Sequence, residues 1–382
     1  MNIAYLYPWD VVGDPSAPAR LAALGVEAVA LAASYHSTRA ATPYHPSHRV
    51  LDVPYPAFYL PIRTSAWSRL VPVGPTWTPA DAYLQARDAL KAVGLQVHAW
   101  TVLTHNSHLG TAHPDLTVRN AFDDPYPYAL CPAHEDVIEY CERLVQEILE
   151  VGEPDGLILE ACGPMGFGHQ SVHEKTSGAD WTATDSDLLS LCFCAACAPR
   201  YPESTKAQVR AAIDRTTPST TDAKPSPPAD TIEEALGSLA DEVRTIRLSL
   251  STTLRQRLIA VARSTAPNTP ITLHANPDPW AAAAFAALPE GEPGADVLVG
   301  NCWGDPATDS ARLTRLQELS TPGQRVGAYV LALPPRPADA TTLADLLRAY
   351  AKAGASEFHL YHAGLASPHR LSALTKALHQ TT

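Results

Sequence analysis

The stretch Asp155-Gly156-Leu157-Ile158-Leu159-Glu160 decides how the rest of the chain is interpreted. It has the pattern of a short, buried apolar strand whose last residue is a carboxylate. A carboxylate at the tip of a buried strand is poorly placed for stability and well placed for chemistry. Because desolvation disfavours the charged form, we expect the pKa of Glu160 to be raised toward the range of a general acid.

Apolar runs typical of strands alternate with helical patterns along the whole chain. The expected strands are residues 3–7, 26–33, 96–103, 156–160, 271–273, 297–300, 326–333 and 358–361. Eight strands and eight helices in alternation, joined by right-handed crossovers, predict an α/β protein with a single (β/α)8 TIM barrel over residues 1–382. A doubly wound open sheet is the alternative. It is disfavoured because no GxGxxG follows the first strand.

The longest interruption of this alternation follows the fourth strand. We expect residues 165–230 to form an insertion that carries a cysteine cluster and a mobile segment rich in Pro, Ser and Thr. The chain is polar and proline-rich from Pro202 to Pro228, which is typical of an irregular surface excursion. One long helix is predicted over residues 231–266. A second long loop, up to Pro79, contains many aromatic residues, which favour an ordered structure.

Composition excludes several classes of function. The chain has 382 residues, 46% of them hydrophobic, and a formal net charge of -12. A negative protein is a poor partner for nucleic acid or an anionic membrane, whereas neutral and cationic ligands stay open. No apolar run approaches about 18 residues, and no signal-peptide pattern opens the chain, so we expect a cytoplasmic protein without a membrane span. A homo-oligomer is not excluded.

Active sites of such barrels lie at the C-terminal ends of the strands. For each single residue an ordinary polar strand end is the simpler interpretation, but aromatic rings together with many hydrogen-bonding groups suit a sugar. We therefore expect a small carbohydrate or glycoside ligand. The residues expected to bind it are Trp9, Asp10, His36, His105, Asn106, His274, Asn276, Asp278, Asn301, Trp303 and His362, with Tyr35 and Tyr361 at neighbouring strand ends.

A hydrolase of glycosidic bonds needs a second carboxylate beside Glu160. The two carboxyl groups stand about 5–5.5 Å apart in retaining enzymes and about 6.5–9.5 Å apart in inverting ones. Asp305 is the favoured partner because Trp303 beside it would form a platform for a sugar ring. Asp278 and Asp10 stay open as alternatives. The structural alternative for Asp305, within Gly-Asp-Pro, is an Asx turn or helix cap.

The cysteines have the spacing of metal ligands. Cys192, Cys194 and Cys197 form a CxCxxC triplet, and Cys131, before the helix that leads into the fourth strand, is the candidate for a fourth ligand. Four thiolates suit a structural, tetrahedral zinc site. The alternative is a coincidental spacing of small buried residues. Seven cysteines in a protein expected in the cytoplasm argue against a disulfide framework.

Histidines offer another chemistry at the same strand ends. No HExxH motif occurs, but several strand histidines would suit a catalytic metal. Two of them, His98 and His359, lie in the middle of strands and are better explained as interior hydrogen bonders. The full set is His36, His98, His105, His274, His359 and His362.

Three stretches of the sequence resemble family-42 β-galactosidases and related barrel glycosidases. Leu130-Cys131-Pro132 and the residues up to Tyr140 resemble the "YCPNSPxYRE" segment of that family. Leu159-Glu160-Ala161-Cys162-Gly163 occupies the place of its acid/base segment at strand four. The CxCxxC triplet resembles the zinc cluster of the family, and Cys131 matches the upstream cysteine that completes it there. By motif the resemblance covers residues 131–201.

The departures from the family limit what the resemblance implies. Leu159 precedes Glu160 where the family has asparagine, and strand seven, residues 326–333, lacks the glutamate that is the family's nucleophile. The resemblance therefore implies a divergent glycoside hydrolase with a zinc site, and not a retaining β-galactosidase.

Three functions follow as hypotheses. The first is a glycosidase in which Glu160 is the general acid and Asp305 the nucleophile or base. The second is a metal-dependent sugar isomerase or lyase that uses the strand-end histidines. The third is a catalytically inactive barrel that binds sugar, which the absence of an acid on strand seven favours.

Overall fold

The eight predicted strands are present and close into a barrel. The computed structural model describes residues 1–168, 173–216, 227, 229–288 and 294–381. All eight neighbouring pairs are parallel, and the last strand pairs with the first, so this sheet has no open edge. Its strands, in order around the barrel, are β1 (Asn2–Leu6), β2 (Ala28–Tyr35), β6 (Gln96–Val102), β9 (Gly156–Glu160), β10 (Ile271–Asn276), β12 (Val297–Cys302), β13 (Arg325–Leu331) and β14 (Glu357–Tyr361).

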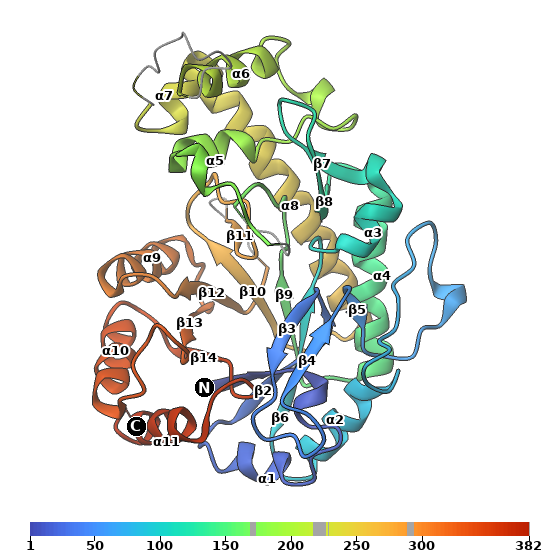
Figure 1. The fold of residues 1–382 in the computed structure, drawn as a ribbon, viewed down its shortest axis with the longest axis vertical. Coiled ribbons are helices and arrows are strands. Elements are labelled where there is room, and N and C mark those ends of the chain that lie inside the picture. The colour runs from blue at the N-terminus through green and yellow to red at the C-terminus, as the bar shows by residue number, and fades with distance from the viewer. Residues whose placement is uncertain (169–172, 217–226, 228, 289–293, 382) are drawn as a thin grey trace.

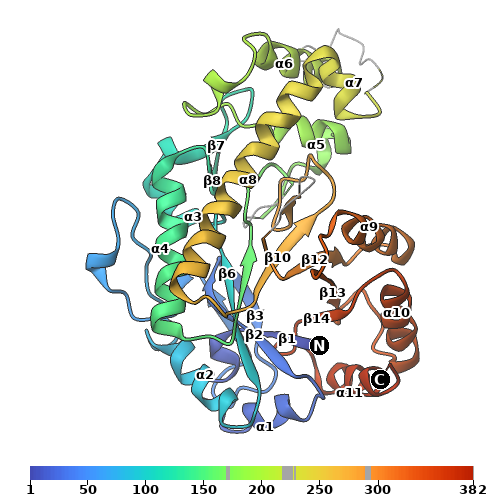
Figure 2. The ribbon, with the colours of Figure 1, turned by 180° about the vertical axis from the view of Figure 1, so that it is seen from behind.

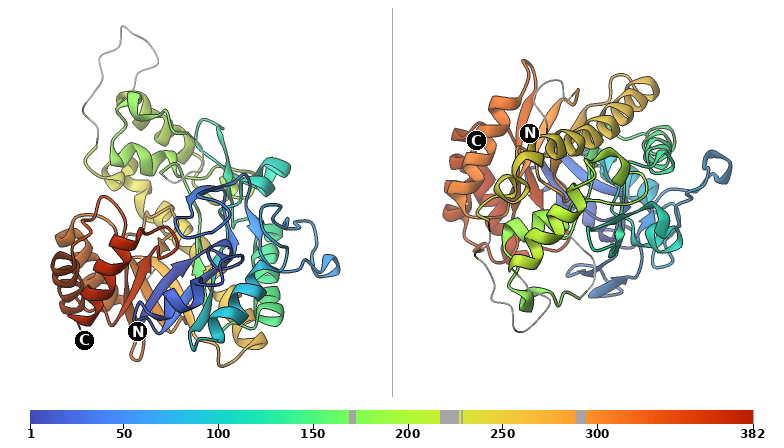
Figure 3. Two further views of the ribbon diagram at one scale, coloured as in Figure 1. Left: turned by 60° about the horizontal axis from the view of Figure 1, so that its bottom comes forward. Right: turned by 90° about the horizontal axis from the view of Figure 1, so that it is seen from above.

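Helices cover the outside of the barrel, so its strands are buried on both faces. In Figure 3 the orange and red C-terminal helices form one side, and the blue-green helices form the opposite side. In Figure 2 the long helix α8 runs beside α4. The covering helices are α1 (Ala17–Ala22), α2 (Ala82–Lys91), α4 (Glu135–Gly152), α8 (Ala240–Thr265), α9 (Pro306–Leu319), α10 (Ala340–Lys352) and α11 (Pro368–His379).

The (β/α)8 prediction holds except for the helix expected after the fifth strand. The described residues between β10 and β12 contain no helix. The chain instead forms a loop that brings the short strand β11 (Ala286–Ala287) parallel to the end of β10, and the Leu288 amide donates to the Asn276 carbonyl at 2.9 Å. This loop places residues 283–285 over the end of the barrel.

The insertion after β9 is more helical than its composition predicted. The helices α5 (Ala183–Leu189), α6 (Thr205–Thr216) and α7 (Ile232–Leu236) gather at one end of the molecule (Figure 1). The expected irregular excursion from Pro202 is wrong for α6, because Val209, Ala212 and Ile213 form a buried stripe at helical spacing. Most of the proposed mobile Pro/Ser/Thr segment, residues 217–226 and 228, lies outside the described residues.

Two further predictions concern the long segments of the chain. The helix expected over residues 231–266 is broken at Gly237, whose φ of +56° lies in the left-handed region that favours glycine. The aromatic loop after β2 is ordered, with Tyr59 and Trp67 buried.

None of the described helices combines the length and the apolar character that crossing a bilayer requires.

Short elements complete the loops. They are the strands β3 (Thr38–Ala41), β4 (Val50–Val53), β5 (Ala57–Phe58), β7 (Thr117–Arg119) and β8 (Pro125–Leu130), the helix α3 (Ser107–Ala112), and 3-10 turns at Pro8–Asp10, Thr64–Ala66, Pro114–Leu116, Ser177–Ala179, Ala198–Arg200 and Gly237–Leu239.

Glycine in β9 makes room for a histidine inside the barrel. A Cβ at Gly156 would lie within 2.8 Å of three ring atoms of His98. We predict that Gly156→Ala lowers the free energy of unfolding by about 1–3 kcal/mol, because an overpacked core must shift. Urea unfolding measures it, with Gly178→Ala, which meets nothing within 4 Å, as the control. An equal loss in a His98→Ala background would contradict the steric explanation.

Candidate active site at the barrel mouth

A cavity of about 350 Å³ opens where the strands end. That volume is in the range of small-molecule sites, about 300–1,000 Å³. Among the described residues that line it, Glu160 is the one carboxylate, and neither lysine nor arginine is present. Its aromatic lining is Tyr35, Trp100, Phe285, Trp303, Tyr329 and Tyr361, and its polar lining includes His36, Thr38 and Asn301.

Glu160 is held at the inner end of the cavity by two neighbours on the same carboxylate oxygen. The Trp100 indole N–H donates to Oε2 at 2.7 Å, and Nδ1 of His274 lies 3.2 Å from the same oxygen. The next residue, Ala161, has a φ of +54°, a strained conformation that turns the chain sharply at the end of β9.

The environment of Glu160 does not have the effect that the sequence predicted. Burial by itself raises the pKa of this carboxyl, as expected. The close contact and charge of His274, together with the hydrogen bond from the Trp100 N–H, outweigh burial and hold the pKa below its ordinary value. The expectation of a raised pKa is therefore wrong, because it considered desolvation without the two neighbours on Oε2.

Aromatic rings form the walls above Glu160. Trp303 is 37% exposed, and its ring stacks on Tyr329 with centroids 5.4 Å apart. Tyr361 lies 4.7 Å from the same indole. Phe285, carried by the loop that follows β10, stacks on His274 at 4.5 Å. Exposed and half-buried ring faces of this kind can pack against the C–H faces of a sugar.

Part of the predicted binding set reaches this cavity. His36, Asn301 and Trp303 line it, and His274 lies directly behind Glu160, fully buried. His105 is buried and does not line the cavity; its ring stacks on His36, with centroids 4.5 Å apart.

Other predicted residues have structural contacts elsewhere. Asn106 caps α3 by accepting from the Leu109 amide, and Trp9 is a core residue stacked on Tyr7. Asn276 accepts from the Asp278 amide. Burial lowers the pKa of His362 to about 3, so its ring is neutral.

None of the three aspartates offered as a partner for Glu160, Asp305, Asp278 and Asp10, lines the cavity. Asp305 is exposed, and its carboxylate accepts from the Ala307 and Thr308 amides at 3.0 and 3.2 Å, which makes it the N-cap of α9. Asp278 is exposed and accepts from the Trp280 amide. Asp305 therefore has the contacts of a helix cap, which was the structural alternative to a catalytic role.

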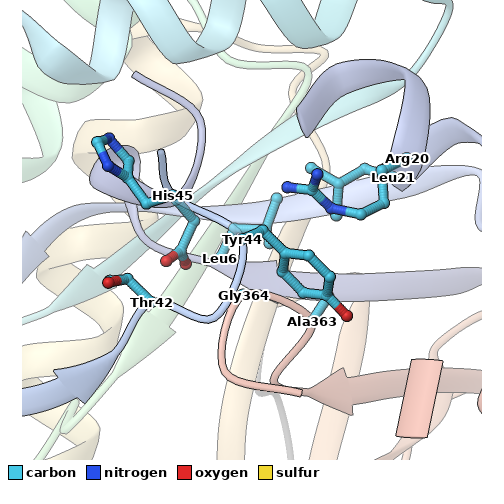
Figure 4. A pocket seen from close by; sticks show the side chains of 9 residues that line it. Leu6, Arg20, Leu21, Thr42, Tyr44, His45, Ala363 and Gly364 are labelled. Atoms are coloured by element: carbon cyan, nitrogen blue, oxygen red, sulfur yellow. The ribbon is translucent and has the colours of Figure 1, made fainter. Parts of the chain in front are cut away.

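Asp10 lines a separate, small pocket whose other lining residues include Thr42, Tyr44 and His45, which Figure 4 labels. The space beside it, about 10 Å³, is of the size that one water fills. Its Oδ2 accepts from the Tyr7 amide at 2.8 Å, whereas no partner among the described residues contacts Oδ1. Gly364 covers it, since a Cβ there would stand 1.9 Å from Oδ2. Burial raises the pKa of Asp10 to about 7 against the Tyr7 amide and the charge of Arg20.

The four predicted cysteines come together. The Sγ atoms of Cys131, Cys192, Cys194 and Cys197 lie within 4.8 Å of one another and are buried. Four converging thiol groups fit a tetrahedral metal ion. Among the described residues this is the one group of three or more His, Cys, Asp or Glu side chains that could hold a metal, so the strand-end histidines form no comparable cluster.

Sequence reasoning missed several residues that build the site. Trp100, Phe285, Tyr329 and Tyr5 are important contacts, and three of them lie inside strands rather than at their ends. Side chains alternate along a strand, so Trp100 faces the same side as His98, and Tyr329 the same side as Gly327. That alternation was the available signal. Phe285 had none, because its segment was expected to be helical.

A second cavity of about 340 Å³ lies in and beside the insertion. Its lining includes Phe122, Tyr126, Phe167, Trp181 and Ile213. It is distinct from the cavity over Glu160, with which it shares no lining residue.

No protein-family model matches the chain, and no curated protein matches its sequence. Solved structures match its fold. The glycoside hydrolase domain of PgaB (BpsB) from Bordetella bronchiseptica aligns with 15% identity and a TM-score of 0.57, over 98% of this chain and 97% of that chain.

Two larger enzymes also match. Alpha-L-fucosidase isoenzyme 2 from Paenibacillus thiaminolyticus aligns with 12% identity and a TM-score of 0.56, over 98% of this chain and 48% of that chain. Gan42B, a GH42 β-galactosidase, aligns with 10% identity and a TM-score of 0.53, over 100% of this chain and 56% of that chain. The chain thus spans about half the length of these two enzymes. The predicted resemblance to glycoside hydrolases is confirmed at the level of the barrel fold.

The buried carboxyl of Asp10 generates a prediction about pH. Between about pH 4 and 7 the carboxyl ionises in the unfolded chain but not in the folded one, so the free energy of unfolding falls as pH rises through this range. Asp10→Asn retains an acceptor for the Tyr7 amide and cannot ionise. We predict that the variant gains stability relative to the parent, on the order of a few kcal/mol, between pH 4 and 8. Parallel stability curves from urea unfolding would contradict it.

Proposed function

We propose that the chain is a glycoside hydrolase-like enzyme that acts on a carbohydrate or glycoside in the cavity over Glu160. The observation that carries the proposal is one buried carboxylate whose Oε2 is held by Trp100 and His274, at the inner end of an aromatic cavity at the barrel mouth. The fold similarity to glycoside hydrolases supports it without identifying a substrate.

The charge of Glu160 determines its role. A carboxyl with a lowered pKa is ionised at neutral pH, so Glu160 suits a nucleophile, a base or a stabiliser of positive charge at the anomeric carbon. This role replaces the general acid of the sequence analysis for the resting enzyme. Burial raises the pKa of Tyr35, Tyr329 and Tyr361, which keeps their hydroxyls neutral and able to donate to sugar hydroxyls.

A barrel that binds a sugar without cleaving it is the second candidate. It is favoured by a specific observation: the described residues lining the cavity supply no carboxylate besides Glu160. A two-carboxylate mechanism needs another acid within about 10 Å. The metal-dependent isomerase has less support, because the described strand-end histidines do not converge.

We further propose that the cysteine cluster holds a structural zinc ion. The four thiols, supplied by the residue after β8 and by the insertion after β9, would join these two segments through one ion. When bound, zinc would supply cross-linking rather than catalysis, since four protein ligands leave no open position.

Replacing Glu160 with glutamine tests the proposal. Glutamine keeps an acceptor for the Trp100 N–H but has no charge, so we predict that Glu160→Gln folds and loses turnover by about 1,000-fold or more. Release of reducing ends or of a chromogenic aglycone from a panel of glycosides measures it. Asp305→Asn is the matched control, expected to retain turnover because Asp305 caps α9. Saccharide binding without turnover of any glycoside would favour the binding-only alternative.

Metal analysis tests the cysteine site. We predict about one zinc per chain, lost in Cys131→Ser and Cys194→Ser, together with a lower melting temperature after chelation. Cys141→Ser is the control: Cys141 is buried in α4 and is outside the cluster, so this variant should keep the metal. Protein that contains no metal and melts unchanged after chelation would contradict the proposal.

A further inference from the structure

A line of buried polar groups runs through the interior of the barrel, away from the cavity. It starts at Glu160 and His274. The Tyr5 hydroxyl lies 2.9 Å from Nε2 of His274 and 3.0 Å from Nδ1 of His359. Nε2 of His359 lies 3.6 Å from a carboxylate oxygen of Glu357. All five side chains are at most 6% exposed.

The two ends of the line are charge contacts. His274 to Glu160, at 3.2 Å, and His359 to Glu357, at 3.6 Å, are at ion-pair distance without the alignment of a hydrogen bond. Such contacts often tighten when a ligand binds. Glu357 also pairs with Arg325, which is 42% exposed, so the line ends at the solvent-facing base of the barrel.

The sequence provides space for this line. A Cβ at Gly327 would stand 3.1–3.2 Å from two ring atoms of His359, so glycine leaves room for the imidazole. Tyr5 packs edge-on against Trp100 and Tyr329, both with centroids 4.8 Å away, which orients its hydroxyl. Tight packing therefore holds the His359 imidazole and the Tyr5 hydroxyl in place along the line.

Hydrogen-bond arithmetic limits how many protons the line holds. The Tyr5 hydroxyl has one hydrogen and faces two imidazole nitrogens. If both imidazoles are neutral and donate to their carboxylates, two acceptors compete for that hydrogen. If both are cationic, both nitrogens donate to Tyr5 and its hydrogen has no acceptor among these groups. One cationic and one neutral imidazole satisfy every group, as buried polar atoms require.

We propose that Tyr5 joins the pairs Glu160–His274 and His359–Glu357 into one proton relay, in which the two imidazoles share a single proton. The His359 Nδ1–H bond breaks as a Tyr5 O–H bond forms, and the original Tyr5 O–H bond breaks as a His274 Nε2–H bond forms. Tyr5 is neutral before and after, and the positive charge has moved from His359 to His274. His274 can then pass the proton on its Nδ1 to Oε2 of Glu160.

The relay lets Glu160 change between the anion at rest and the neutral carboxyl. The proton arrives on Oε2 from His274, on the side of the barrel interior, so no solvent needs to enter the cavity. Tyr5 and His359 are then positioning residues that act through His274, since neither lines the cavity. This last role rests on the proposed function, whereas the shared proton does not.

Other charged and titratable groups face the line and bias where the proton resides. Arg325 and the N-terminal amine act on the Glu357–His359 end. His98 neighbours His359; burial, and then the charge of His359, lower its pKa to about 4, so it stays neutral. His36 acts on Glu160, and Tyr329 is packed beside Tyr5.

Nitrogen NMR of histidine-labelled protein tests the relay directly. We expect signals of His274 and His359, assigned with His274→Asn and His359→Gln, to show together one cationic imidazole at neutral pH and to titrate in concert. Tyr5→Phe should uncouple them and move at least one midpoint by about one pH unit or more. Tyr83→Phe is the control, because it removes an equally buried hydroxyl that has no hydrogen-bond partner among the described residues.

Several outcomes separate the relay from the proposed function. Two independent titrations in the parent protein, or curves unchanged in Tyr5→Phe, would overturn the relay. If Tyr5→Phe does not fold, His359→Gln must shift the His274 titration, and an unshifted curve overturns the relay as well. Where a glycoside is turned over, both variants should move the pH profile of kcat and leave KM within about twofold. Coupled titration without turnover would refute the hydrolase alone.

Discussion

The candidate site depends on a single carboxylate that is kept charged inside the barrel. Glu160 ends the strand β9 and is 6% exposed, which by itself would favour the neutral acid. The Trp100 N–H and the His274 imidazole converge on Oε2 and stabilise the anion. The aromatic walls, the segment that carries Phe285 and the strained turn at Ala161 all surround this group. Changing His274, which does not line the cavity, would alter the chemistry available at Glu160 without removing a wall of the site.

Most of the fold could be predicted from the sequence, because the local periodicity of apolar residues indicates strands and helices. The strand expected over residues 96–103 is β6, which spans Gln96–Val102, and the strand expected over residues 156–160 is β9, with the same bounds. Where tertiary pairing decides the structure, the sequence was less informative. Residues after β10 pair back onto that strand instead of forming a helix, and α6 hides a three-residue apolar stripe in a polar, proline-rich region.

The site was predicted in part. Strand ends and the spacing of metal ligands can be recognised in the sequence alone. The sequence therefore identified Glu160, the four cysteines and several strand-end residues. The pKa of Glu160 was not predicted correctly, since it depends on donors from β6 and β10, about 60 and 114 positions away along the chain. Asp305 illustrates the opposite error: Gly-Asp-Pro before a helix specifies a cap by local chemistry, and a position near Trp303 did not change that.

A crystal structure of the protein with a bound oligosaccharide tests most directly whether a saccharide binds over Glu160. We predict a sugar ring packed on Trp303, with its anomeric carbon about 3–3.5 Å from Oε1 of Glu160. A sugar that occupies the second cavity, beside Phe122 and Trp181, and leaves the Glu160 cavity empty would contradict it.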